Sequence, residues 1–173
     1  MTPSLPTCPP LVRTATIPAD PEAAFRRFTA EMGAWWPLAT HSIGQGRAQS
    51  VEMQPEVGGR IVETVAGSEE SVWGTIVAWE PPRRVAFTWH PGHEPASAQD
   101  VEVRFEPAGA GTLVTLTHTG FERLGKDAKG ARRAYPMGWT YVLGLYAGRR
   151  GVTMRLLTAL TALVSYLSRR RGR

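Results

Sequence analysis

Residues 49–120 alternate apolar and polar side chains, and turn-forming residues interrupt the alternation at short intervals. A period of two is typical of strands with one buried face, and short turns favour antiparallel pairing of neighbouring strands. The turns fall at Gly58-Gly59, Gly67-Ser68, Pro81-Pro82, Pro91-Gly92 and Gly109-Ala110-Gly111. The pattern therefore predicts strands at 49–55, 59–66, 71–80, 83–90, 99–107 and 112–120, in a curved sheet that wraps around another element.

The segment before the sheet predicts one more strand and a helix. Residues 11–17 alternate, and Pro18 ends that strand. Asp20 is a favourable N-cap, Pro21 suits the first helical position, and apolar residues recur at helical spacing until Gly33. Residues 41–50 are expected to form a loop or a short distorted helix.

Two helical patterns follow the sheet. An aromatic and apolar stripe runs through 127–148, where Pro136 either kinks the helix or marks its start. Residues 152–167 are largely apolar, contain Arg155 and are followed by three arginines. This segment is shorter than the ~20 residues that span a membrane. It docks on the body of the protein, pairs with a second subunit, or lies on an anionic membrane surface.

Composition indicates a globular protein with one domain. Hydrophobic residues make up 42% of the 173 and charged residues 20%, both near ordinary usage. A chain of this length buries roughly 70% of its unfolded surface, enough for a core and a cavity. Cys8 is the single cysteine, so no intrachain disulfide is possible, and a cytoplasmic location is expected. Residues 1–10 lack a signal-peptide pattern and predict a proline-rich disordered tail.

Charge is unevenly distributed. Residues 1–122 hold eight Lys and Arg against 14 Asp and Glu, whereas 123–173 hold 12 against Asp127 alone. A basic end suggests an anionic partner or surface, although solvated arginines are the commoner explanation.

Several of these motifs, taken in order, resemble the START-like (SRPBCC) superfamily and its family of heat-shock protein 90 ATPase activator homologues. The matching residues are 20–25, Trp35-Trp36-Pro37, Gly58-Gly59-Arg60, Trp73-Gly74, 80–84, Phe87-Thr88-Trp89, Gly111-Thr112, 117–121 and Gly138-Trp139. The resemblance implies an α+β helix-grip fold, in which a curved antiparallel sheet wraps a long C-terminal helix and encloses a hydrophobic cavity. The START-like domain would span 11–148, and 149–173 would form a basic amphipathic helical extension that the family pattern lacks.

The inward face of such a sheet and the helix that fills it supply the candidate cavity residues. Trp35 and Trp36 either anchor the first helix or form an aromatic gate, and His118 is either a core residue or a ligand contact. The candidates are Trp35, Trp36, Trp73, Phe87, Trp89, Val103, Phe105, Leu116, His118, Tyr135, Trp139 and Leu143. Aromatic rings with polar tips suit a mostly apolar ligand.

No motif predicts a catalytic, metal or cofactor site. The four histidines are scattered, and no nucleophile triad, phosphate loop or dinucleotide fingerprint is present. No nucleic-acid partner is expected. The leading hypothesis is non-catalytic binding of a small hydrophobic or amphipathic molecule, such as a lipid. The alternatives are a stress-response protein that contacts a chaperone ATPase, and a cyclase- or aromatase-like enzyme with His118 or Glu63 as its acid or base.

Overall fold

The computed structural model describes residues 8–68 and 70–149. Seven strands are present, one for each that the sequence predicts. They are β1 (Leu11–Ile17), β2 (Ala48–Met53), β3 (Arg60–Val65), β4 (Ser71–Glu80), β5 (Arg84–Trp89), β6 (Gln99–Ala108) and β7 (Gly111–Thr119). They form one antiparallel sheet in the order β1-β7-β6-β5-β4-β3-β2.

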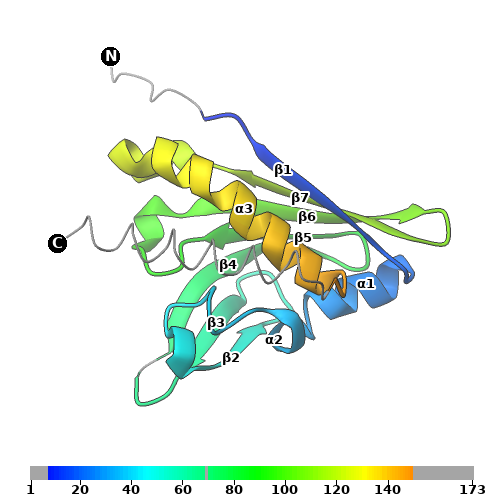
Figure 1. The fold of residues 1–173 in the computed structure, drawn as a ribbon, viewed down its shortest axis with the longest axis horizontal. Helices are drawn as coiled ribbons and strands as arrows, with labels where there is room; N and C mark the ends of the chain where they lie inside the picture. The colour runs from blue at the N-terminus through cyan, green and yellow to red at the C-terminus, as the bar shows by residue number, and fades with distance from the viewer. Residues whose placement is uncertain (1–7, 69, 150–173) are drawn as a thin grey trace.

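The helices are α1 (Pro21–Phe28), α2 (Met32–Trp35) and α3 (Ala128–Tyr146), with short 3₁₀ helices at Gln45–Arg47, Pro95–Ser97 and Phe121–Asp127. Figure 1 shows α3 lying diagonally across the sheet, which curls around it, while α1 and α2 lie at one end. The helix-grip fold is therefore confirmed. Pro136 lies inside α3 rather than at its start.

The first helix is shorter than the pattern of apolar residues predicts. The Asp20 carboxylate caps it by accepting the Ala23 N–H at 2.8 Å. The helix ends at Phe28 because Thr29 is its C-cap, and the Thr29 hydroxyl donates to the Phe25 carbonyl at 2.8 Å. A separate turn of helix, α2, then carries Met32 and Trp35 into the core.

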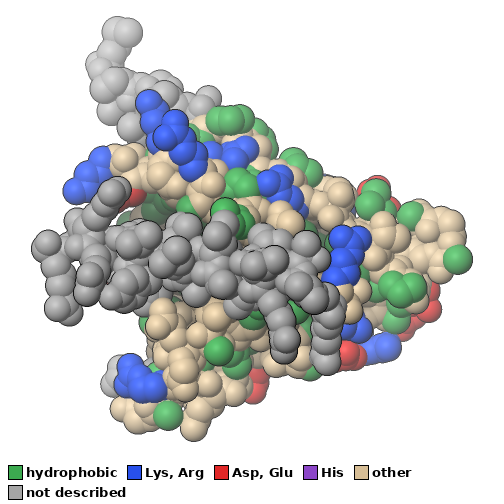
Figure 2. Space-filling view, viewed as in Figure 1, with side chains coloured by type: hydrophobic (Ala, Val, Ile, Leu, Met, Phe, Trp, Pro, Cys, Tyr) green, Lys and Arg blue, Asp and Glu red, His purple; other side chains and the backbone are tan. Residues whose placement is uncertain are grey.

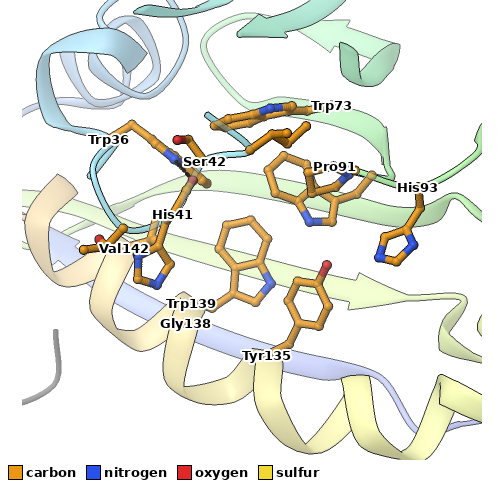
Figure 3. Close-up of a pocket in the computed structure, with 14 residues that line it drawn as sticks. Trp36, His41, Ser42, Trp73, Pro91, His93, Tyr135, Gly138, Trp139 and Val142 are labelled. Carbon is orange, nitrogen blue, oxygen red and sulfur yellow. Dashed lines mark hydrogen bonds between the residues drawn. The ribbon is translucent and has the colours of Figure 1, made fainter. Parts of the chain in front are cut away.

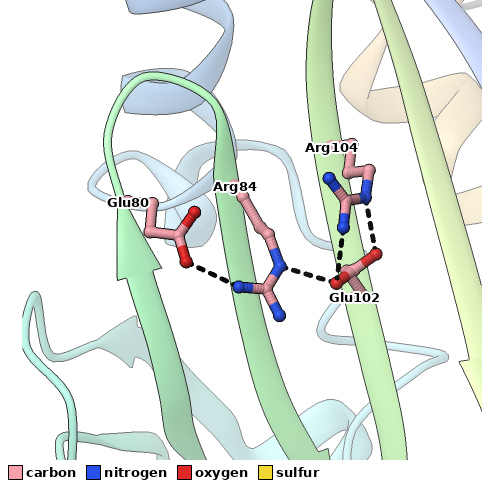
Figure 4. Close-up of polar contacts among 4 residues, drawn as sticks. All are labelled: Glu80, Arg84, Glu102 and Arg104. Carbon is pink, nitrogen blue, oxygen red and sulfur yellow. Dashed lines mark hydrogen bonds and ion pairs between the residues drawn. The ribbon is translucent and has the colours of Figure 1, made fainter.

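The two faces of the sheet differ as the alternation predicts. On β6, Val101, Val103 and Phe105 are buried, whereas Glu102 and Arg104 point to the other face. That outer face carries a row of ion pairs across β4, β5 and β6 (Figure 4). Arg84 bonds Glu80 and Glu102 at 2.6 Å each, and Glu102 bonds Arg104 at 2.7 Å.

Aromatic rings fill the inner face at the end that α1 covers. Phe28 packs edge-on against Phe105 and Tyr146, with ring centroids 5.8 and 5.3 Å apart, and lies 5.4 Å from Trp35. The Tyr146 hydroxyl donates to the Ala24 carbonyl at 2.8 Å, which ties the end of α3 to α1. This end of the grip is a packed core.

β1, at one edge of the sheet, and the two prolines that precede it hold α3 along its length. Arg13 on β1 donates to the Thr140 hydroxyl at 3.0 Å, and Arg132 donates to the Pro9 and Pro10 carbonyls at 2.9 and 3.0 Å. Basic side chains are prominent on the face drawn in Figure 2. The predicted helix at 152–167 and most of the predicted tail at 1–10 lie outside the described residues. Within the described residues, no helix has both the length and the apolar character needed to cross a membrane.

Candidate functional site

A pocket of about 550 Å³ lies between α3 and the inner face of the sheet, away from the packed end. Tyr135, Gly138, Trp139 and Val142 of α3 form one wall (Figure 3). The sheet contributes Trp73 from β4 and Trp89 from β5. Two loops complete the lining: one carries Trp36 and residues 40–43, and the other is Pro91-Gly92-His93.

Four indole rings dominate the walls of this pocket. Trp36 and Trp73 have ring centroids 5.2 Å apart, Trp73 and Trp89 are 5.7 Å apart, and Trp89 and Trp139 are 5.5 Å apart. These rings offer flat apolar faces to a bound molecule. None of the lining side chains is an Asp, Glu, Lys or Arg.

Three of the four indole N–H groups are satisfied by protein acceptors. Trp36 donates to the His41 carbonyl at 2.7 Å, Trp73 to the Glu63 carboxylate at 2.8 Å, and Trp139 to His118 Nδ1 at 3.0 Å. The Trp89 N–H is buried and reaches no acceptor in good hydrogen-bond geometry among residues 8–68 and 70–149, although it interacts with the Tyr135 side chain closely enough to lower the pKa of that group. An unsatisfied buried donor is uncommon in proteins and calls for an explanation.

Glu63 shapes the pocket from behind its wall. Its fully buried carboxylate accepts the backbone N–H groups of Ile43 and Gly44 at 2.9 and 2.7 Å, in addition to the Trp73 indole. Gly44 fits there because a Cβ would come within 3 Å of the Val65 methyl groups. The carboxylate therefore joins a loop and a strand that both line the pocket, and it is a structural clamp rather than a residue exposed to a ligand.

His41 brings a polar group to the pocket wall. Its Nδ1 lies 2.9 Å from the Thr40 hydroxyl. Burial lowers the pKa of His41 to about 4, so its imidazole is neutral at physiological pH. A neutral imidazole donates one hydrogen bond and accepts another, so His41 can bind a polar group of a ligand, but a pKa this low makes it a weak base.

Tyr135 supplies a hydroxyl that points into the cavity (Figure 3). Burial raises its pKa to about 12, an effect that the nearby Trp89 indole partly offsets. The hydroxyl is therefore protonated at physiological pH and can donate a hydrogen bond.

His118 is buried behind Trp139 and does not line the pocket. Its ring packs against Phe121 and Tyr135, with centroid distances of 4.3 and 4.6 Å. Burial is the main cause that lowers its pKa, to about 3. Because Nδ1 accepts from Trp139, the proton resides on Nε2, for which the described residues provide no acceptor. In this position His118 orients Trp139.

The candidate residues divide into two groups. Trp36, Trp73, Trp89, Tyr135 and Trp139 line the pocket. The others are buried in the core and do not line it: Trp35, Phe87, Val103, Phe105, Leu116, His118 and Leu143. Sequence patterns did not predict the lining residues Gly138, Val142, 40–43 and 91–93. Two sequence segments could have indicated these loops: His41-Ser42 and Pro91-Gly92-His93 place polar or histidine side chains next to turn residues, and binding residues often lie on such loops.

No three His, Cys, Asp or Glu side chains cluster as metal ligands in the described part of the chain.

Known structures share this fold. The chain is 30% identical to the anthrahydroquino-Gama-pyrone synthase Txn09 complexed with SUM, with a TM-score of 0.57, covering 83% of this chain and 98% of that one. CalU16 from Micromonospora echinospora is 19% identical, with a TM-score of 0.57 and 90% and 84% coverage. The Aha1 dimer from Colwellia psychrerythraea is 16% identical, with a TM-score of 0.58 and 83% and 100% coverage. The last two likenesses show the fold alone.

No curated protein sequence matches the chain. The sequence profile of the activator of Hsp90 ATPase homolog 1-like proteins, in contrast, matches residues 18–144, which is most of the chain and includes almost all of the helix-grip domain described above. Together with the 30% identical synthase, this match shows that the chain belongs to the START-like family of activator of Hsp90 ATPase homolog 1-like proteins.

Proposed function

We propose that the protein binds a small hydrophobic or amphipathic molecule in the pocket between α3 and the sheet. The observation that carries this proposal is the set of four indole rings around a space of about 550 Å³ with no Asp, Glu, Lys or Arg among the lining side chains. A cavity of this size is within the range of small-molecule sites, and its few polar groups suit a ligand that is mostly apolar.

Two glycines of α3 provide a matched test. Gly138 lines the pocket, so Gly138→Leu would fill it, whereas Gly130→Leu adds the same side chain where a Cβ meets no atom within 4 Å. The probe is N-phenyl-1-naphthylamine, a neutral fluorescent aromatic amine. We expect the wild-type chain and Gly130→Leu to bind it equally and Gly138→Leu to bind at least tenfold more weakly.

Native mass spectrometry of the full chain provides a second test, because a co-purified apolar molecule would be released on denaturation. Equal binding of the probe to the wild-type chain and to Gly138→Leu would mean that the probe binds outside this pocket. Absence of both probe binding and a co-purified molecule would overturn the proposal.

An enzyme that acts on a molecule held in the same pocket is the second candidate. Two observations favour it: the relative at 30% identity is named a synthase, and the imidazole of His41 lies in the pocket wall. In that case His41→Gln would abolish turnover of a bound compound while changing its affinity little. The chaperone alternative is supported by the family name alone.

A further inference from the structure

We propose that the exposed side of α3, together with the 3₁₀ turn before it, is a docking surface for an anionic lipid bilayer. This basic face consists of Lys126, Lys129 and Arg133. None of the three side chains lines the pocket, so the inference goes beyond the proposed function and does not depend on it.

The first observation is that the charges of the basic face are not neutralised. Lys129 and Arg133 are four residues apart in α3 and project from the same side of the helix. All three side chains are exposed, and no ion pair among residues 8–68 and 70–149 includes any of them. The chain has no Asp or Glu from 128 to 149, and Asp127 is the nearest acidic residue in sequence. Exposed cations without partners attract an anionic surface.

The second observation is that the two faces of the molecule differ in charge. The outer face of the sheet, on the side away from α3, carries Glu80 and Glu102, and its arginines are paired with them. The α3 side, drawn in Figure 2, displays many basic side chains and few acidic ones. An anionic surface would therefore orient the protein with α3 toward it and the sheet away from it.

The third observation is the composition of the sequence after α3, which favours a bilayer over a nucleic acid. Residues 152–167 are largely apolar, contain Arg155 and are followed by three arginines. Apolar residues flanked by arginines suit the boundary between lipid head groups and acyl chains, whereas a nucleic acid binds chiefly through its phosphates. Stable attachment to a bilayer requires two such signals, a basic patch and an apolar element, and this chain has both.

Vesicles of two compositions test the inference with the full chain. One is phosphatidylcholine alone, and the other contains about one quarter phosphatidylglycerol. We expect sedimentation with the vesicles to give an affinity at least tenfold higher for the anionic composition. Because salt screens exposed charges, this preference should shrink when NaCl is raised from about 0.1 M to about 0.5 M.

Charge reversal of the basic face assigns the binding to it. Each Lys or Arg held near an anionic bilayer raises the affinity about fivefold. The triple variant Lys126→Glu/Lys129→Glu/Arg133→Glu should therefore lose at least tenfold in affinity for the anionic vesicles.

A second triple variant controls for net charge. Arg47→Glu/Arg60→Glu/Arg83→Glu makes the same change in charge at exposed positions outside α3 and should lose less than threefold. Circular dichroism checks that both variants fold. Leu160→Asp, within the apolar segment, should weaken vesicle binding without affecting binding to a DNA duplex, the competing polyanion.

Three outcomes would overturn the inference. They are equal affinity for neutral and anionic vesicles, equal losses in the two triple variants, and displacement of the chain from anionic vesicles by the DNA duplex at equal concentration of negative charge. Binding of N-phenyl-1-naphthylamine, measured without vesicles, reports on the pocket alone. It should be unchanged in the Lys126→Glu/Lys129→Glu/Arg133→Glu variant, so failure of this inference and failure of the proposed function are distinguishable.

Discussion

The Glu63 carboxylate and the Trp73 indole form a buried hydrogen bond of 2.8 Å that joins β3 to the aromatic wall on β4. The same carboxylate also holds the backbone of Ile43 and Gly44, so three donors converge on it. A single buried side chain thus fixes two parts of the pocket that are distant in sequence. This arrangement shows why a charged residue is kept in the core of a small domain.

Glu63→Gln tests this clamp. The amide offers one acceptor oxygen in place of two, and its NH₂ group would face a donor that now lacks a partner. We expect the free energy of unfolding to fall by about 2–4 kcal/mol, measured by urea denaturation, and the affinity for N-phenyl-1-naphthylamine to decrease. Glu52→Gln changes an exposed carboxylate on the adjacent strand and should have almost no effect. Equal stability of the two variants would contradict the role given to Glu63.

Gly74→Ala tests the close approach of β4 and β5. A Cβ at Gly74 would overlap the backbone carbonyl oxygen of Thr88, which cannot move independently of β5. We expect a loss of about 2–3 kcal/mol in the free energy of unfolding, measured by urea denaturation. Gly130→Ala, at an open position of α3, should instead stabilise by about 0.5–1 kcal/mol. A neutral effect of Gly74→Ala would mean that the two strands can separate at this point.

Most of the fold could be predicted because its signals are local. Alternation, turn residues and the Asp20-Pro21 cap depend on neighbours in sequence, and they predicted each strand and the long helix. The end of α1 was missed because the apolar spacing continues to Met32, whereas the Thr29 hydroxyl bonds the backbone and ends the helix earlier.

The pocket was only partly predictable for a different reason. Alternation tells which strand positions face inward, but α1 fills one end of the inner face, so Phe105 and Leu143 lie in core rather than in pocket lining. His41 lies in the wall because the distant Glu63 holds the following residues of its loop, and no local pattern contains that contact. His118 faces inward as the alternation predicts, but Trp139 lies between it and the cavity.

The ion pairs on the outer face predict a modest, salt-dependent contribution to stability. Arg84 links Glu80 and Glu102, and its side chain is 27% exposed (Figure 4). We expect Arg84→Ala to cost about 1 kcal/mol at low ionic strength and less in 1 M NaCl, measured by urea denaturation. Arg60→Ala, which breaks an exposed pair 4.0 Å long, should cost less. A loss that does not depend on salt would indicate that Arg84 acts through packing of its aliphatic stem.

The two buried histidines predict a loss of stability in mild acid. The pKa of His118 is about 3 and that of His41 about 4 in the folded chain, whereas both take up a proton near pH 6.5 when unfolded. Above about pH 7.5 both are neutral in either state, so stability is constant. As pH falls below 6.5 the unfolded chain binds more protons, and the free energy of unfolding decreases. Relative to the constant value at higher pH, the loss at pH 5 should be about 4 kcal/mol for the pair.

Urea denaturation at closely spaced pH values between 7.5 and 5 measures this slope, above the range in which most carboxylates titrate. Near pH 5 the slope of the free energy of unfolding against pH should correspond to the uptake of nearly two protons on unfolding of the wild-type chain. In His41→Gln it should correspond to one proton, because only His118 then remains. NMR should show that neither imidazole protonates in the folded chain over the same range. A free energy of unfolding that stays constant between pH 6.5 and 5 would mean that both imidazole rings reach solvent in the folded chain. That result would contradict the buried position of His118 behind Trp139, and with it the role of His118 in orienting the pocket wall.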